Sequence, residues 1–381
     1  MKSIPNSVLV LLMALVCISC AGQVQTQEME GEPTEAMVET TDAIHAKFAP
    51  PAGRFLLFVG QDLDAVSGYV TGVHANPSGI TTYTNIAEGP GRVLLHGLAS
   101  TVDYGAGLVN GQASVDDHPH ALLAIGLDLV DHTGENLLHI ADGIHNEAID
   151  SLGAFIQESQ RPVFLRIGYE FDGQWNHYHP KQYIAAFRAI VDRLRSNGVD
   201  NFVSVWQSAT YTLGTYQNRP IEDWYPGDEY VDWMGTSYFV FDPEVYQRFL
   251  EFAREHQKPI MIAEASPQGY ELEDLTYGSP FTGGLSLQEK TSEQIWGEWF
   301  APFFDFIYEN SDVIRAVAYI NNDWNSQPMW EPAANNGYWG DTRIEVNEFI
   351  RAKWLEEINQ GNWLHANEDL YDLLGFAKEE N

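Results

Sequence analysis

The sequence has few cysteines and few basic residues, and each shortage excludes classes of protein. Both cysteines, Cys17 and Cys20, lie within the first 20 of 381 residues. The rest of the chain therefore has no disulfide, thiol nucleophile or cysteine metal site. Twenty Lys and Arg residues stand against 54 Asp and Glu residues, a formal net charge of −34. Nucleic acid binds clustered positive charge, so we expect no nucleic-acid partner.

No apolar run reaches the roughly 20 residues that a transmembrane helix needs. A short run, VLVLLMALV at 8–16, follows Lys2 and precedes CISCAG, a pattern typical of an export signal. Ser19 before Cys20 resembles the lipobox of bacterial lipoproteins, although Cys17 stands where Leu is usual. We expect a lipoprotein-type signal peptide at 1–20, a lipid on Cys20, and export to the outer membrane or cell surface. Plain cleavage near Ala21, giving a periplasmic or secreted protein, is the alternative.

The remaining chain divides by composition into a linker and one large domain. Residues 21–50 are acidic and polar and lack a hydrophobic period, which predicts a flexible linker. From residue 51 to residue 381, continuous apolar runs alternate with amphipathic segments. The runs predict buried parallel strands at 55–60, 79–84, 121–129, 162–167, 202–207, 231–239, 259–264 and 314–320. The segments predict helices at 146–159, 180–198, 243–257, 296–311 and 341–358.

This alternation predicts an α/β fold, a single (β/α)8 TIM barrel over 51–381. Residues 85–120 show no clean helix and are the weakest part of the pattern. The rival fold, a doubly wound open sheet, usually carries a glycine-rich phosphate loop after an early strand. The segment GPGRVLLHG at 89–97 has neither the spacing nor the context of such a loop.

Two carboxylates fall where predicted strands end, and such ends form the active-site face of a barrel. Glu170 follows the strand at 162–167, and Glu264 ends the strand at 259–264. Opposed carboxylates of this kind act as acid/base and nucleophile on a glycosidic bond. Arg166 is positioned to donate hydrogen bonds to Glu264, and Tyr238 to add a phenolic one. The alternative is a pair of structural carboxylates that neutralise Arg166 or cap helices.

The same residues carry a resemblance to a known family. RIGYEFDGQW resembles the signature Arg-x-x-His-Glu-x-Asn-Gly-x-Trp of glycoside hydrolase family 26. VSVWQS, YPGDEYVDWMGTSYF and KPIMIAEAS resemble three later strands of that family, with Tyr169 and Asp172 as departures from the signature. The resemblance implies that Glu170 is the acid/base and Glu264 the nucleophile. It also implies that Arg166 and Tyr238 support Glu264 and that two tryptophans stack on sugars, Trp175 and Trp206.

Other polar and aromatic residues at the strand ends are candidates for substrate contact. The full set of substrate-binding candidates is Gln61, Asp128, Tyr169, Asp172, Trp175, Trp206, Gln207 and Trp324. The segments VDDHPH at 115–120 and LVDHTGEN at 129–136 mix Asp with His, but neither has a recognised metal-ligand spacing. We therefore expect no metal and no cofactor, and we expect a monomer.

The resemblance implies a retaining endo-β-glycanase. Its members act on β-mannan, which we take first as the substrate, or on β-1,3-xylan or mixed-linkage glucan. Two alternatives remain open from the sequence. One is a non-catalytic, surface glycan-binding lipoprotein on a barrel. The other is a clan A glycosidase of another family that acts on a marine polysaccharide.

Overall fold

The computed structural model describes residues 44–87, 92–131, 133–210, 219–240, 243–282, 284, 286–331 and 336–377. The chain divides into units 1–40 and 41–381, and every described residue belongs to the second unit. The expected signal peptide, Cys20 and most of the expected linker lie outside the described residues. Phe48, near the end of the expected linker, is buried and packs edge-on against Phe376 at 6.1 Å. The folded body therefore begins before residue 51.

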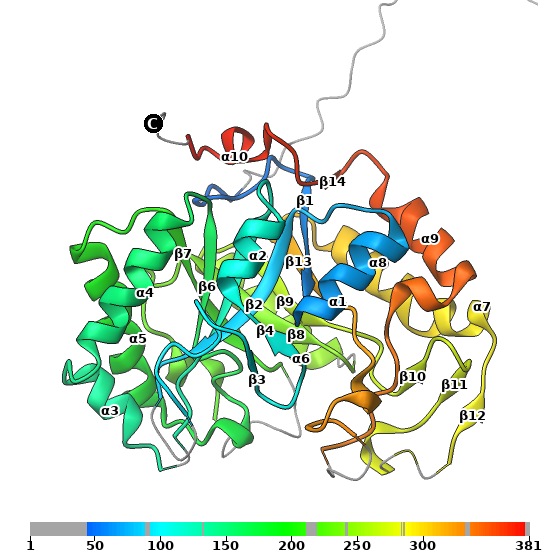
Figure 1. Ribbon diagram of the computed structural model, residues 1–381, viewed down its shortest axis with the longest axis horizontal. Helices are drawn as coiled ribbons and strands as arrows, with labels where there is room; N and C mark the ends of the chain where they lie inside the picture. Colours follow the sequence, from blue (N-terminus) through cyan, green and yellow to red (C-terminus); the bar gives the residue numbers. More distant parts are fainter. Residues whose placement is uncertain are drawn as a thin grey trace, which may run out of the picture. The chain divides into compact units, whose positions relative to one another are not determined.

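Parallel strands close into a (β/α)8 barrel, as the alternation predicted (Figure 1). Pairing of β1 with β13 closes the ring, with Leu56 beside Ala316. A short extra strand, β14 (Trp363–Leu364), pairs with the start of β1. The barrel strands coincide with the predicted runs: β1 (Phe55–Gly60), β2 (Gly79–Asn85), β5 (Leu122–Asp128), β6 (Val163–Ile167), β7 (Phe202–Ser208), β8 (Trp233–Tyr238), β9 (Ile260–Ala265) and β13 (Ile314–Ile320).

Helices cover the outside of the barrel, and the clearest predicted ones are present. The described α-helices are α1 (Leu63–Gly68), α2 (Gly111–Asp117), α3 (Asn136–Ala141), α4 (Asn146–Glu158), α5 (Pro180–Ser196), α6 (Pro243–Glu255), α7 (Ser292–Ile295), α8 (Ala301–Glu309), α9 (Glu348–Ile358) and α10 (Leu370–Leu373). The helix predicted at 296–311 is a π-helical turn, Trp296–Phe300, followed by α8. The weak segment 85–120 contributes α2 and a small hairpin. Within the described part of the chain, no helix is long and apolar enough to cross a membrane.

Side chains alternate between the barrel interior and the helix layer along each strand. The interior contains Phe58, Phe164 and Trp233, whose rings meet edge-on at 5.2 and 5.0 Å. The opposite faces of the strands belong to a larger cluster that includes the helices. Because the interior is filled with side chains, the ends of the strands are the places where functional groups can meet a substrate.

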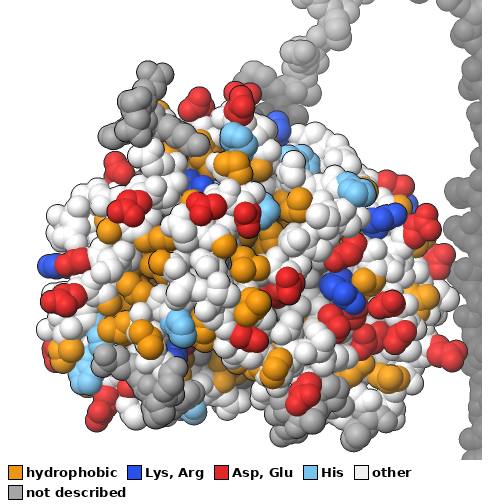
Figure 2. Space-filling view, viewed as in Figure 1, with side chains coloured by type: hydrophobic (Ala, Val, Ile, Leu, Met, Phe, Trp, Pro, Cys, Tyr) orange, Lys and Arg blue, Asp and Glu red, His pale blue; other side chains and the backbone are white. Residues whose placement is uncertain are grey.

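The two ends of the barrel carry different additions. β14 and α10 lie at one end, where the strands begin (Figure 1). At the opposite end are a hairpin of β3 (Val102–Asp103) with β4 (Leu108–Val109) and a three-stranded sheet. That sheet is formed by β10 (Tyr270–Glu271), β11 (Thr276–Tyr277) and β12 (Gln288–Glu289). Acidic side chains are spread over the face seen in Figure 2, with few basic ones between them.

Candidate active site

Glu264 reaches the barrel mouth because β9 is irregular at this point. Thr236 of β8 pairs with Ile262, but the next residue, Ser237, pairs with Glu264, so one residue of β9 is extra. Simple alternation from Met261 and Ala263, which face the interior, would turn Glu264 toward the helices. A β-bulge adds one residue and re-aims the side chain that follows it. Glu264 is buried and lies at the end of the strand as predicted.

Arg166 of β6 is fully buried and donates from its terminal nitrogen to Glu264 Oε1. The guanidinium lies between two rings, 5.3 Å from the centre of Tyr83 and 5.1 Å from that of Tyr169. Burial by itself would lower the pKa of Arg166, but the nearby Tyr83 and Glu264 raise this pKa above its usual value. The predicted pairing of Arg166 with Glu264 is present, and it leaves a cation beside this carboxylate.

The phenolic hydrogen bond to Glu264 comes from Tyr83 and not from Tyr238, which corrects the prediction. The Tyr83 hydroxyl donates to Glu264 Oε1 at 2.9 Å and accepts from Arg166 at 3.3 Å. Among the described residues, the hydrogen bonds that Glu264 accepts come from Tyr83 and Arg166. Tyr238 points to the helix layer instead, where its ring contacts those of Phe303 and Phe306 at 4.9 and 5.5 Å.

Tyr83 reaches Glu264 from β2 because the neighbouring strand leaves room for its ring. Gly126 of β5 pairs directly with Tyr83, and a Cβ at Gly126 would lie 2.4 Å from a carbon of the tyrosine ring. Tyr83 is not among the site residues predicted from the sequence. Its position near the end of the strand predicted at 79–84 is the signal that could have identified it.

Glu170 lies in the turn that follows β6. Its backbone is left-handed, with φ at 53°, a conformation that a non-glycine residue rarely adopts. The turn is fixed by two hydrogen bonds to the Glu170 carbonyl oxygen, from Gly173 N and from Asn176 Nδ2, each at 2.8 Å. Strained backbone of this kind persists where surrounding contacts hold it, most often at functional sites.

Within the described part of the chain, the carboxyl group of Glu170 accepts two hydrogen bonds, and neither comes from a cation. Ser237 Oγ donates to Oε1 at 2.7 Å, and Trp175 Nε1 donates to Oε2 at 3.1 Å. Burial and the nearby charge of Glu264 raise the pKa of Glu170 to about 8, although the Ser237 hydrogen bond lowers it. The group is therefore protonated at neutral pH, as a general acid must be.

Trp206 and Gln207 are neighbours on β7, and the structure separates their roles. Trp206 is 0% exposed and stacks on Phe171 at 4.5 Å, so the predicted sugar platform is a core residue between sheet and helices. Gln207 faces inward and accepts from Arg166 Nε at 2.7 Å. Gln207, predicted to bind substrate, is buried among protein groups and supports Arg166 instead.

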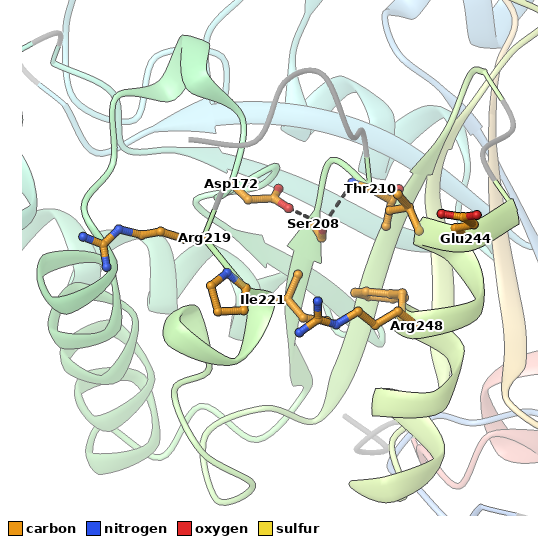
Figure 3. Close-up of a pocket in the computed structure, with 10 residues that line it drawn as sticks. Asp172, Ser208, Thr210, Arg219, Ile221, Glu244 and Arg248 are labelled. Carbon is orange, nitrogen blue, oxygen red and sulfur yellow. Dashed lines mark hydrogen bonds between the residues drawn. The ribbon is translucent and has the colours of Figure 1, made fainter. Parts of the chain in front are cut away.

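Asp172 and Trp324, both predicted to bind substrate, are buried and make their contacts with other protein groups. Asp172 is buried and accepts from Ser208 Oγ at 2.6 Å and from Ala209 N at 2.7 Å. Its side chain points to Ser208, on the wall of a cavity of about 410 Å³ that Figure 3 shows. Trp324 is buried and stacks on Trp339 at 4.5 Å.

The remaining predicted contact residues lie around the mouth. Trp175 is 44% exposed. Tyr169 is half-buried and meets Tyr83 edge-on at 5.6 Å. Asp128 forms an ion pair with Arg92. Gln61 is nearly buried at the end of β1, and its amide nitrogen has no hydrogen-bond partner among the described residues. The described residues include no cluster of three or more His, Cys, Asp and Glu side chains able to hold a metal.

Two carboxyl groups with different hydrogen-bond donors lie at the carboxyl ends of the barrel strands. This arrangement is typical of the (β/α)8 glycoside hydrolases. Comparison with known proteins agrees. The glycosyl hydrolase family 26 profile matches residues 129–268. The β-1,3-xylanase TXYA of a Vibrio species is 38% identical over 348 residues, which cover 89% of this chain and 72% of that protein. A β-1,3-xylanase of an Alcaligenes species is 37% identical over 341 residues, 88% of this chain and 70% of that protein.

The chain belongs to glycoside hydrolase family 26, and it is a retaining endo-β-glycanase. Solved structures of the family share its fold. The β-mannanase BoMan26A of Bacteroides ovatus gives a TM-score of 0.54 at 16% identity, over 86% of this chain and 94% of that one. The mannanase BCman of Bacillus subtilis gives 0.52 at 14% identity, over 84% and 88%.

Proposed function

We propose that the protein is an exported endo-β-1,3-xylanase that works by double displacement, with Glu264 as nucleophile and Glu170 as acid/base. The observation that carries the mechanism is the contrast between the two carboxyl groups. Glu264 lies beside the buried cation Arg166. Among the described residues, the donors to Glu170 are neutral, and burial and Glu264 raise its pKa to about 8.

The choice of β-1,3-xylan among the three expected substrates rests on the named relatives. Both β-1,3-xylanases match nearly nine tenths of this chain. The mannanase structures, at 16% identity or less, support the shared fold alone. Tyr169, which replaces the histidine of the family signature, lines the same corner as Arg166 and Tyr83, so a change of sugar at this position is physically reasonable.

The reaction proceeds in two balanced steps. In the first, Glu264 attacks the anomeric carbon while the proton of Glu170 moves to the glycosidic oxygen, which leaves as an alcohol. In the second, the Glu170 carboxylate takes a proton from water, whose oxygen attacks the anomeric carbon and releases Glu264. Arg166 and Tyr83 hold the nucleophile toward the mouth, and the exposed indole of Trp175 offers a flat face beside Glu170 for a sugar ring.

The first 20 residues support a proposal of export and anchoring. We propose that Cys20 carries a lipid which holds a monomeric enzyme at the bacterial outer membrane or cell surface. Replacing Cys20 by Ala should move the protein from the membrane fraction to the soluble fraction, and replacing Cys17 by Ala should not. A membrane-bound Cys20→Ala protein would contradict the anchor.

The substrate is tested with purified enzyme on β-1,3-xylan, β-1,4-mannan and mixed-linkage β-glucan. We expect mass spectrometry to show β-1,3-xylo-oligosaccharides, with viscosity falling faster than reducing ends rise, and proton NMR to show products that first appear as the β-anomer. A Glu264→Ala preparation excludes contaminating hydrolases. Cleavage of mannan without cleavage of β-1,3-xylan would overturn the substrate, and binding without turnover on all three would favour a glycan-binding protein.

A further inference from the structure

Ser237, at the end of β8, is the donor to Glu170 that is least accessible to solvent. Its side chain is 1% exposed, whereas Trp175, the other donor, is 44% exposed. Ser237 pairs in register with Glu264 on β9, so one strand end lies beside both carboxyl groups. A substrate entering the mouth can displace the indole of Trp175, but it cannot reach the hydroxyl of Ser237.

A chain of hydrogen bonds fixes the direction in which the Ser237 hydroxyl donates. Arg166 Nε donates to Gln207 Oε1 at 2.7 Å, and Gln207 Nε2 donates to Ser237 Oγ at 3.1 Å. A guanidinium is only a donor, so it orients the amide of Gln207 with its oxygen toward Arg166. The NH2 group of Gln207 then faces Ser237 and occupies a lone pair of Ser237 Oγ. The serine hydrogen is left for Glu170 Oε1, at 2.7 Å.

No water can intervene in this chain, because Arg166, Gln207 and Ser237 are all essentially buried. The three residues come from β6, β7 and β8, which are neighbours in the barrel, so the rigid sheet sets the spacing of the donors. Hydrogen bonds to ionised groups are shorter and stronger than neutral ones, particularly where water is excluded.

We propose that Ser237 is a positioning residue for the acid/base: Arg166 and Gln207 hold its hydroxyl as a permanent donor to Glu170 Oε1. The inference rests on the proposed role of Glu170. When the proton leaves Glu170 for the glycosidic oxygen, Ser237 stabilises the carboxylate that forms. Because Oε1 is occupied by Ser237, the transferable proton resides on Oε2, the oxygen whose other contact is the displaceable indole.

The test compares Ser237→Ala with Ser237→Thr, which restores a hydroxyl, and with Ser204→Ala as a matched control. Ser204 is a buried serine of β7 whose hydroxyl hydrogen bonds to Tyr230 and Asp232, away from Glu170. The donor stabilises the ionised form of Glu170, so its removal raises the pKa of that group. In Ser237→Ala, the alkaline limb of the kcat/KM profile should move up by about one pH unit, and kcat should fall roughly tenfold.

In Ser237→Thr, the limb should return toward that of the unmodified enzyme, and in Ser204→Ala it should stay in place. A merely structural serine would lower kcat or stability without moving the limb, and that result would overturn the proposal. So would an unchanged kcat and limb in Ser237→Ala.

A carbon-13 NMR titration of the Glu170 carboxyl, assigned with Glu170→Gln, separates this inference from the proposed function. An upward shift of the titration midpoint in Ser237→Ala supports the hydrogen-bond chain without reference to turnover. Full activity in Glu170→Gln would refute the acid/base role instead, even if that shift were seen. An unmoved midpoint would overturn the role of Ser237 alone.

Discussion

Glu264 and Glu170 are the same residue type at the ends of two strands, yet their surroundings differ in the sign of the nearby charge. Glu264 accepts from the Arg166 guanidinium and from Tyr83, which itself accepts from Arg166. Glu170 accepts from a serine hydroxyl and an indole, and the charge that affects its pKa most is the negative charge of Glu264. This difference suits Glu264 to be the nucleophile and Glu170 to be the acid, because a nucleophile must be charged and an acid must keep its proton.

The comparison also shows that one cation can serve both groups. Arg166 donates a hydrogen bond directly to Glu264. Its charge acts on Glu170 from a greater distance, and its hydrogen bond to Gln207 reaches Glu170 through Ser237. Substitution of Glu264 and substitution of Glu170 should therefore have different effects on the kinetics.

Removing the nucleophile should have the largest effect. Glu264→Ala leaves the anomeric carbon without an attacking group, so kcat on β-glycan should fall by about 10⁵-fold or more. Glycan binding should persist, since the sugar contacts elsewhere are intact. Activity assays and calorimetric titration with oligosaccharide measure the two properties. Retention of full activity in this variant would refute the assignment.

Removing the acid should have a smaller effect that depends on the leaving group. In Glu170→Gln, kcat/KM on polysaccharide should fall by roughly 10³-fold, the usual contribution of general acid catalysis. An aryl glycoside with an acidic phenol needs no proton, so its first step should be nearly unaffected. The glycosyl-enzyme should then accumulate, because the base for the second step is missing, and mass spectrometry of the intact protein would detect it. An equal loss on both substrates would argue against an acid/base role.

The raised pKa of Glu170 predicts a pH dependence of stability with a definite sign. Between the ordinary carboxyl pKa of 4.5 and about 8, the folded state holds a proton that the unfolded state has lost. Stability conferred by that proton is complete below 4.5 and is lost as the pH rises toward 8, by on the order of 1 kcal/mol per pH unit. Glu170→Gln carries no titrating proton, so its stability should decline less over this range.

Urea unfolding of both proteins at pH 4, 6 and 8 measures this difference. The variant should gain relative stability as the pH rises. Parallel curves for the two proteins would show that the surroundings of Glu170 do not penalise its charge, and the contrast with Glu264 would lose its basis.

The sequence identified the barrel and both carboxyl groups because those signals are strong and local. Continuous apolar runs mark strands covered on both faces, and every predicted barrel strand is present. Glu170, Glu264 and Arg166 stand at or just after strand ends, and a strand end can be recognised from the run of apolar residues alone. The corrections at Trp206 and Tyr238 share one cause, which is the face of the strand on which a side chain lies.

On β7 the inward residue is Gln207 and the outward one is Trp206, and on β8 they are Ser237 and Tyr238. A shift of one residue exchanges the two faces, and strand ends predicted from sequence are uncertain by more than one residue. Glu264 shows the opposite case, since a bulge places it in the mouth against the simple alternation of β9. Such bulges depend on pairing between strands, which the chain alone does not display.

The smallest expected effect sharpens this point, because it compares two tyrosines at strand ends. Tyr83→Phe removes the hydroxyl that donates to Glu264 at 2.9 Å, a loss of about 1.5 kcal/mol for a bond to a charged group. This loss corresponds to a roughly tenfold lower kcat/KM. Tyr238→Phe removes a hydroxyl from a ring that packs in the helix layer, and it should change kcat/KM less than twofold. Steady-state kinetics on the same glycan measures both, and the reverse order would restore to Tyr238 the role that the sequence suggested.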